Sequence, residues 1–217
     1  MHFKAVCFDL DGTLLDSLTD LTNCTNKILS KRGFPEHPES SFRSFIGDGA
    51  EMLITRALPK EARGKSIIEE CIADFEKTYR ECWNEYTVPF PNIPELLDSL
   101  CFRKLKLTVL SNKPHEFTKL AVRELLPRWN FEIVLGERKG FPRKPDPKGI
   151  FEICEDLSIP SDEFVFIGDT ANDMKTGLAA GCLSVGVLWG LRSEEELRNN
   201  GANFIIKDPL ELLDLLV

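Results

Sequence analysis

Hydrophobic residues follow two different periods along the chain. Short apolar runs rich in β-branched and aromatic residues alternate with helical patterns at the start and through the second half. The apolar runs predict strands at residues 3–8, 106–110, 131–135, 164–167, 183–188 and 204–206. Helices are predicted at residues 94–103, 114–126, 148–157, 172–181, 193–199 and 210–216. This alternation predicts an α/β fold, in which helices cover both faces of a mostly parallel sheet.

Only helical periodicity is visible between the first strand and the proline-rich segment that begins at Pro89. Apolar residues at helical spacing predict helices at 18–29, 50–58 and 66–86. We therefore expect one domain formed by residues 1–15 and 89–217, with an all-helical domain, residues 16–88, inserted after the first strand.

Composition narrows the classes of function. The chain of 217 residues is 42% hydrophobic and 29% charged, which is ordinary for a globular protein that is not membrane-embedded. A net charge of −8 argues against a general nucleic-acid binder, which needs a basic face. No apolar run approaches the ~18 residues of a membrane span. We expect a cytoplasmic protein, with neither nucleic acid nor membrane as partner.

The cysteines suggest neither a disulfide framework nor a zinc site. There are seven, an odd number, and none form a C-x-x-C pair. A reducing cytosol suits this usage.

Polar residues follow four of the predicted strands, and in a parallel sheet such strand ends lie at one edge. The residues are Asp9 and Asp11, then Ser111 to Lys113, then Lys144, then Asp169 and Asp173. Each has an ordinary explanation alone: Asp11-Gly12 as a surface hairpin, Ser111-Asn112 as a helix cap, Lys144 as a solvated loop residue. Their convergence favours a shared site.

These residue types suit phosphoryl chemistry. Asp9, Asp169 and Asp173 offer the carboxylate oxygens that Mg²⁺ prefers. A carboxylate can also attack phosphorus and split one hard step into two easier ones. Ser111, the N–H groups after it and Lys144 could hold phosphate oxygens and offset charge in the transition state.

The chain resembles the haloacid dehalogenase superfamily of hydrolases over essentially its whole length. The first motif is Asp9-Leu10-Asp11-Gly12-Thr13, the second Ser111, the third Lys144, and the fourth runs from Gly168 to Asp173. Residues Phe45 to Gly49 and the run Pro91 to Leu97 resemble the phosphoglycolate phosphatase-like branch, which has a small helical cap. The resemblance implies a Rossmann-like core and a cap formed by the helical insertion.

The resemblance also implies roles for individual residues. Asp9 would be the nucleophile, and Asp11 would protonate the leaving oxygen and then deprotonate the attacking water. Mg²⁺ would be held by Asp9, the main-chain carbonyl of Asp11 and Asp169, with Asp173 acting through water or by orienting a neighbouring residue. The phosphoryl group would be bound by residues of the first three motifs: Gly12, Thr13, Ser111, Asn112 and Lys144. An aspartate at position 11 is the family's mark of phosphate ester chemistry.

Substrate specificity would come from the cap. Gly47 and Gly49, which flank Asp48, would let the backbone approach a ligand closely. Arg43 or Arg56 could meet a substrate carboxylate, although exposed arginine is the common case.

The leading hypothesis is a Mg²⁺-dependent phosphatase that acts through an aspartyl-phosphate on a small phosphorylated metabolite, with 2-phosphoglycolate the first candidate. Alternatives on the same core are a phosphosugar mutase and a pyrophosphatase. Another class is a phospho-aspartate signalling module or a binding protein without turnover.

Overall fold

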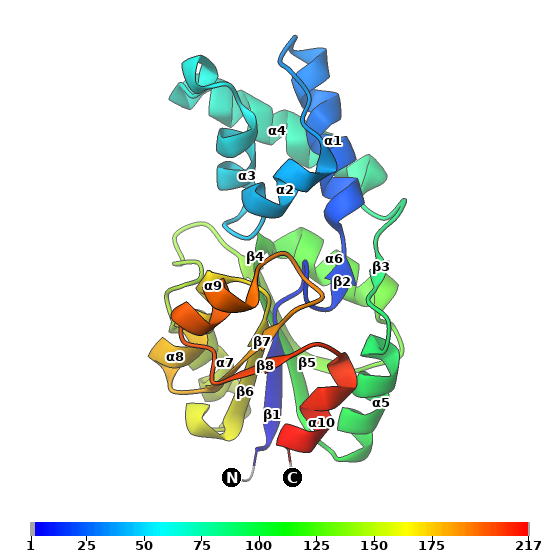
Figure 1. The fold of residues 1–217 in the computed structure, drawn as a ribbon, viewed down its shortest axis with the longest axis vertical. Coiled ribbons are helices and arrows are strands. Elements are labelled where there is room, and N and C mark those ends of the chain that lie inside the picture. Colours follow the sequence, from blue (N-terminus) through cyan, green and yellow to red (C-terminus); the bar gives the residue numbers. More distant parts are fainter. Residues whose placement is uncertain (1–2, 217) are drawn as a thin grey trace. The chain divides into compact units, whose positions relative to one another are not determined.

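The computed structural model describes residues 3–216, which divide into two compact units. One unit contains the chain up to Leu15 and again from Pro89, and the other is Asp16–Val88 (Figure 1). The two connections between them pair as a short two-stranded sheet, formed by β2 (Leu15–Asp16) and β3 (Val88–Pro89).

The first unit is built on a parallel sheet with the order β5-β4-β1-β6-β7-β8. Strand β1 lies inside this sheet, with Phe8 beside Val109 of β4 and Ile167 of β6. The strands are β1 (Ala5–Phe8), β4 (Lys106–Pro114), β5 (Phe131–Glu137), β6 (Phe164–Gly168), β7 (Leu183–Val187) and β8 (Phe204–Ile206). The predicted parallel α/β fold is confirmed.

Helices cover both faces of this sheet. Helix α7 packs on α8, and α5 packs on α10, as expected when right-handed crossovers run in opposite directions from the central strand. The helices are α5 (Ile93–Phe102), α6 (His115–Leu125), α7 (Lys148–Leu157), α8 (Ala171–Ala180), α9 (Glu194–Asn199) and α10 (Leu212–Leu215). A core cluster joins the sheet to α7 and α8 and includes Cys7, Leu110, Ile150, Phe164 and Phe166.

Strand β4 is longer than the sequence predicted. It continues past the expected end at residue 110 through Ser111, Asn112 and Lys113, and α6 begins only at His115. The register with β5 shifts between Leu110 and Pro114, so these three residues lie in an irregular part of the ladder. The helix-cap interpretation of Ser111-Asn112 is therefore wrong.

The second unit consists of α1 (Leu18–Lys31), α2 (Glu39–Phe45), α3 (Ala50–Ala57) and α4 (Lys65–Cys82), with a 3₁₀ turn at Lys60–Ala62. Helix α2 was not predicted. Only Phe42 of this helix is buried, so it shows too little apolar periodicity to be recognised.

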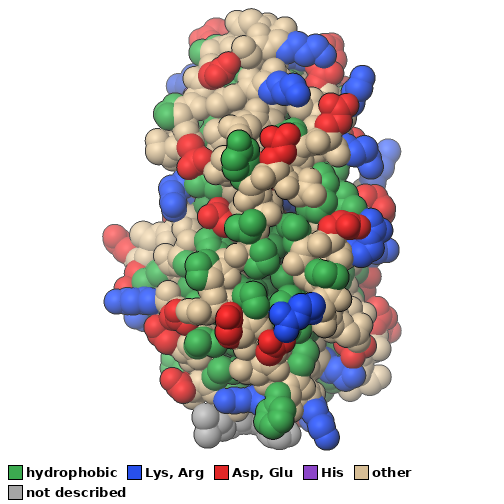
Figure 2. Space-filling view, turned by 90° about the vertical axis from the view of Figure 1, so that its right-hand side faces the viewer, with side chains coloured by type: hydrophobic (Ala, Val, Ile, Leu, Met, Phe, Trp, Pro, Cys, Tyr) green, Lys and Arg blue, Asp and Glu red, His purple; other side chains and the backbone are tan. Residues whose placement is uncertain are grey.

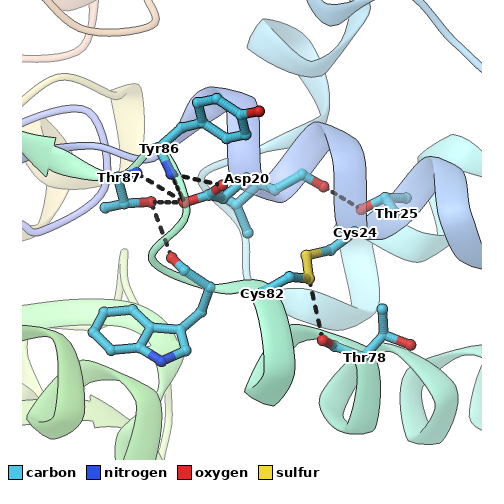
Figure 3. The surroundings of a disulfide bond; sticks show 9 residues. Asp20, Cys24, Thr25, Thr78, Cys82, Tyr86 and Thr87 are labelled. Atoms are coloured by element: carbon cyan, nitrogen blue, oxygen red, sulfur yellow. Dashed lines mark hydrogen bonds between the residues drawn. A yellow bond between two sulfur atoms is a disulfide. The ribbon is translucent and has the colours of Figure 1, made fainter.

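Helix α4 ends at Cys82, four residues before the predicted end. Asp20 of α1 holds the chain beyond this point (Figure 3). Its side chain is only 1% exposed. Its carboxylate accepts hydrogen bonds from the backbone N–H of Tyr86 at 3.0 Å and of Thr87 at 2.8 Å, and from the Thr87 hydroxyl at 2.6 Å. The N–H groups of Tyr86 and Thr87 thus donate to α1 and not to carbonyls within α4, and both residues lie beyond the end of α4.

Cys24 of α1 and Cys82 at the end of α4 form a disulfide (Figure 3). The expectation of no disulfide was therefore wrong, because a count of cysteines carries no information about which two lie close in the fold. The other five cysteines of the described chain are free.

The molecular surface carries charges of both signs. Figure 2 shows Lys and Arg side chains interspersed with Asp and Glu side chains on one face. None of the helices formed by residues 3–216 has the length and apolar character that a membrane crossing requires.

We expect Asp20→Ala to lower the free energy of unfolding by about 3 kcal/mol, because buried backbone donors at Tyr86 and Thr87 lose their acceptor. Urea denaturation measures this loss. The exposed Asp16 provides the control, since Asp16→Ala should change stability by less than about 0.5 kcal/mol. Equal stability of the two variants would contradict the role assigned to Asp20.

Candidate active site

Asp9 directly follows β1 and is fixed between neighbouring strands. Its backbone N–H donates to the Ile167 carbonyl of β6 at 2.9 Å, and its side chain is nearly buried. The Nζ of Lys144 lies 2.8 Å from its Oδ1. The first acid of the predicted constellation is thus held beside a lysine from a loop far along the chain.

A tight turn follows Asp9. The Leu10 carbonyl accepts hydrogen bonds from the backbone N–H groups of Leu14 and Leu15, both at 3.0 Å. Gly12 has a φ of +86°, and a Cβ there would lie 2.3 Å from the Oδ2 of Asp169. Only glycine therefore allows both the turn and this close approach. The surface-hairpin alternative is wrong, because Leu10 and Thr13 are fully buried.

Asp173 links Lys144 to the start of α8. Its Oδ1 lies 2.6 Å from the Lys144 Nζ. Its Oδ2 accepts from the N–H of Thr170 at 2.9 Å and from the Thr170 hydroxyl at 2.6 Å, in a capping box. The same carboxylate thus caps a helix and holds the lysine.

Asn112 fixes the backbone at Lys144. Its Nδ2 donates to the Lys144 carbonyl at 3.1 Å, and its Oδ1 accepts from the Lys144 N–H at 2.9 Å. This two-way amide contact ties β4, at the residue after Ser111, to the loop before α7.

Asp11 pairs with a different lysine. The Nζ of Lys113 lies 3.0 Å from its Oδ1 and 3.1 Å from its Oδ2. The structure thus separates the acids: Asp9 and Asp173 contact Lys144, whereas Asp11 contacts Lys113.

Burial and mutual repulsion shift the pKa values of these acids. Burial raises the pKa of Asp9, and the charge of Asp173 raises it further while Lys144 lowers it, leaving a pKa of about 6. Burial and the charges of Asp9 and Asp173 raise the pKa of Asp169 well above its ordinary value. Burial lowers the pKa of Lys144, but the charges of Asp173 and Asp9 outweigh this and raise it. One lysine thus stands among three buried acids.

This donor set fits a small divalent cation. Carboxylate oxygens of Asp9, Asp169 and Asp173 all lie within 4.8 Å of one another. The buried Oδ1 of Asp9 accepts no hydrogen bond of good geometry, although Lys144 forms an ion pair with it. A group of close oxygen donors with unbalanced negative charge is the environment that Mg²⁺ takes.

The cap candidates lie in the second unit. Arg56 forms a salt bridge with Asp48 and donates to the Phe45 carbonyl at 3.0 Å, so it holds the backbone of the segment that precedes α3. Gly47 and Gly49 have φ values of +119° and +86°, and Arg43 is exposed.

Sequence reasoning missed the loop after β7. The Leu191 N–H donates to the Oδ2 of Asp169 at 2.7 Å, and the Trp189 indole N–H donates to the Thr13 carbonyl at 3.0 Å. A Cβ at Gly190 would lie 2.4 Å from the Asp169 Cβ. The loop after β7 follows another strand at the same sheet edge, and this position was the signal that could have identified it.

Comparisons with known proteins agree on one family. A family model described as "Haloacid dehalogenase-like hydrolase" matches residues 6–187. Phosphoglycolate phosphatase of Chromobacterium violaceum is 31% identical and covers 99% of this chain and 97% of its own. That of Mannheimia succiniciproducens is also 31% identical, over 99% of both chains. A crystal structure of a predicted phosphoglycolate phosphatase from Haemophilus somnus matches with a TM-score of 0.92 and 27% identity, over 100% of this chain and 99% of that one.

The raised pKa values of Asp9 and Asp169 predict how a divalent cation acts on stability. Both acids hold protons more tightly in the folded state, so the metal-free protein should lose stability as the pH rises through about 6. A bound cation replaces those protons. We therefore expect Mg²⁺ to raise the melting temperature more at about pH 7.5 than at about pH 5.

Thermal unfolding followed by fluorescence measures this shift, with the same ionic strength of NaCl as the control. Asp169→Asn should reduce the Mg²⁺-dependent shift. A shift of equal size at both pH values would contradict the assignment of these acids as the cation site.

Proposed function

The chain belongs to the haloacid dehalogenase-like hydrolase family and is a phosphatase, and we propose that it hydrolyses 2-phosphoglycolate with Mg²⁺ through an aspartyl-phosphate on Asp9. The observation that carries this proposal is the buried group of Asp9, Asp169 and Asp173 with Lys144 between two of them. Such a group supplies a nucleophile, a metal site and a counter-charge at one point.

In the proposed reaction the carboxylate of Asp9 attacks phosphorus, and the ester oxygen leaves with the bonding electron pair. Asp11 donates its proton to that oxygen as the bond breaks. It then takes a proton from the water that attacks the phosphorus of the aspartyl-phosphate. The second step regenerates Asp9 and releases inorganic phosphate.

The other residues stabilise the transferring phosphoryl group. Lys144 is already held beside Asp9 by two ion pairs, so its charge needs no rearrangement during reaction. Ser111 would bind a phosphate oxygen, together with N–H groups near Gly12, Thr13 and Asn112. Mg²⁺, held by Asp9, Asp169, Asp173 and the Asp11 carbonyl, would supply positive charge that offsets the charge on the phosphate oxygens.

Support for the substrate comes from the names of the full-length relatives. In this proposal the cap, residues 16–88, selects the substrate, and Gly47, Asp48 and Gly49 are the candidate segment for contacting it. Arg43 and Arg56 are the candidates for binding a substrate carboxylate, and Arg56 also forms a salt bridge with Asp48. The cytoplasmic location expected from the sequence stays a prediction, which cell fractionation tests.

A panel of small phosphate esters, assayed for phosphate release with Mg²⁺ and with a chelator, tests the proposal. We expect 2-phosphoglycolate to have the highest kcat/KM and the chelator to abolish release. Asp9→Asn should remove turnover, and Asp11→Asn should lower it about 10²- to 10⁴-fold. The exposed Asp162 provides a matched control, because Asp162→Asn leaves the site intact.

Three outcomes would contradict parts of this proposal. Full activity of Asp9→Asn would exclude the aspartyl-phosphate. Isomerised sugar phosphate without incorporation of oxygen from labelled water would indicate a mutase. Lack of metal-dependent release from every ester would leave a signalling or binding module.

A further inference from the structure

Lys113 lies in a part of the chain that is fixed on both sides. Its backbone N–H donates to the Ser111 hydroxyl at 3.3 Å, and its carbonyl accepts from the Thr118 hydroxyl at 3.0 Å. It also lies in the irregular part of β4, where the register with β5 shifts. The position of its Cα is therefore set by both the strand and the following helix.

Its side chain is buried against Asp11. The Lys113 side chain is 4% exposed and that of Asp11 is 13% exposed. The Nζ lies at nearly equal distances, 3.0 Å and 3.1 Å, from the two carboxylate oxygens. Removing an ammonium group from water is costly unless it is paired, so this contact is a strong constraint on where both side chains lie.

Each acid of the site is held by contacts of its own, and for Asp11 the contact with Lys113 is one of them. Asp9 is fixed by its backbone bond to β6, and Asp169 by the N–H of Leu191. Asp11 starts the Gly12 turn and is only partly buried. Proton transfer requires the carboxyl group within hydrogen-bond reach of the leaving oxygen, and a displaced group loses that benefit.

We propose that Lys113 is the positioning residue for proton transfer: its contact with both oxygens of Asp11 keeps that carboxyl group at the leaving-group oxygen. This inference rests on the proposed function. The proton itself passes from the Asp11 carboxyl group to the departing oxygen, and Lys113 acts only through Asp11.

Substrates with different leaving groups distinguish a positioning role of Lys113 in proton transfer from a purely structural role. An alkyl phosphate needs its leaving oxygen protonated, whereas a 4-nitrophenyl phosphate leaves readily without a proton. We expect Lys113→Met to lower kcat/KM about 10²-fold or more for the alkyl ester and less than about 5-fold for the nitrophenyl ester. Asp11→Asn should show the same contrast.

A double-mutant cycle tests whether Lys113 acts through Asp11. In the Asp11→Asn background, adding Lys113→Met should change kcat/KM for the alkyl ester by less than about 2-fold. This pair also leaves no unpaired buried charge, so it guards against loss of folding. Lys106 is the matched control: it lies on the same strand, pairs with Glu132 at 2.7 Å and is half exposed, so Lys106→Met should leave both rates unchanged.

Equal losses on the two esters would overturn the inference, as would additive losses in the double variant. A crystal structure of Lys113→Met with the Asp11 carboxyl group unmoved would overturn it independently of any activity. An inactive wild-type protein would instead refute the proposed function. The two failures are therefore distinct.

Discussion

The first unit is organised by the placement of several negative charges in a small buried volume. Asp9, Asp169 and Asp173 are each at most 5% exposed, and Lys144 balances only part of their charge. Isolated charges in such surroundings are unstable unless they are paired or bind a metal. The fold must therefore hold the acids rigidly against their own repulsion, and most of the polar contacts around the site serve this purpose.

Different elements contribute to that rigidity. The capping box of α8 orients Asp173, the loop after β7 orients Asp169, and the amide of Asn112 fixes the backbone that carries Lys144. The Gly12 turn brings the chain against Asp169 with no room for a Cβ. Apart from the local capping box, these contacts join segments that are remote in sequence, so the site is a product of the whole sheet edge.

Sequence patterns were sufficient for the sheet, because each buried strand is a short apolar run and alternation with helices dictates parallel pairing. They also predicted that Asp9, Lys144 and Asp169 lie at one edge of the sheet. They could not reveal that β4 continues through Lys113 or that Trp189 reaches the first turn, since both depend on tertiary contacts. The end of α4 was predicted too late in the chain for the same reason. The residue that accepts the hydrogen bond of the Tyr86 N–H is Asp20, which lies 66 residues earlier in the sequence.

The order of the strands has a consequence for how the protein is made. Strand β1 is synthesised first, but its partners β4 and β6 begin 101 and 159 residues after it, at Lys106 and Phe164. The second unit, by contrast, is continuous from Asp16 to Val88. On the ribosome the helical segment can therefore fold before β1 has its partner strands, and the centre of the sheet forms only when most of the chain has emerged.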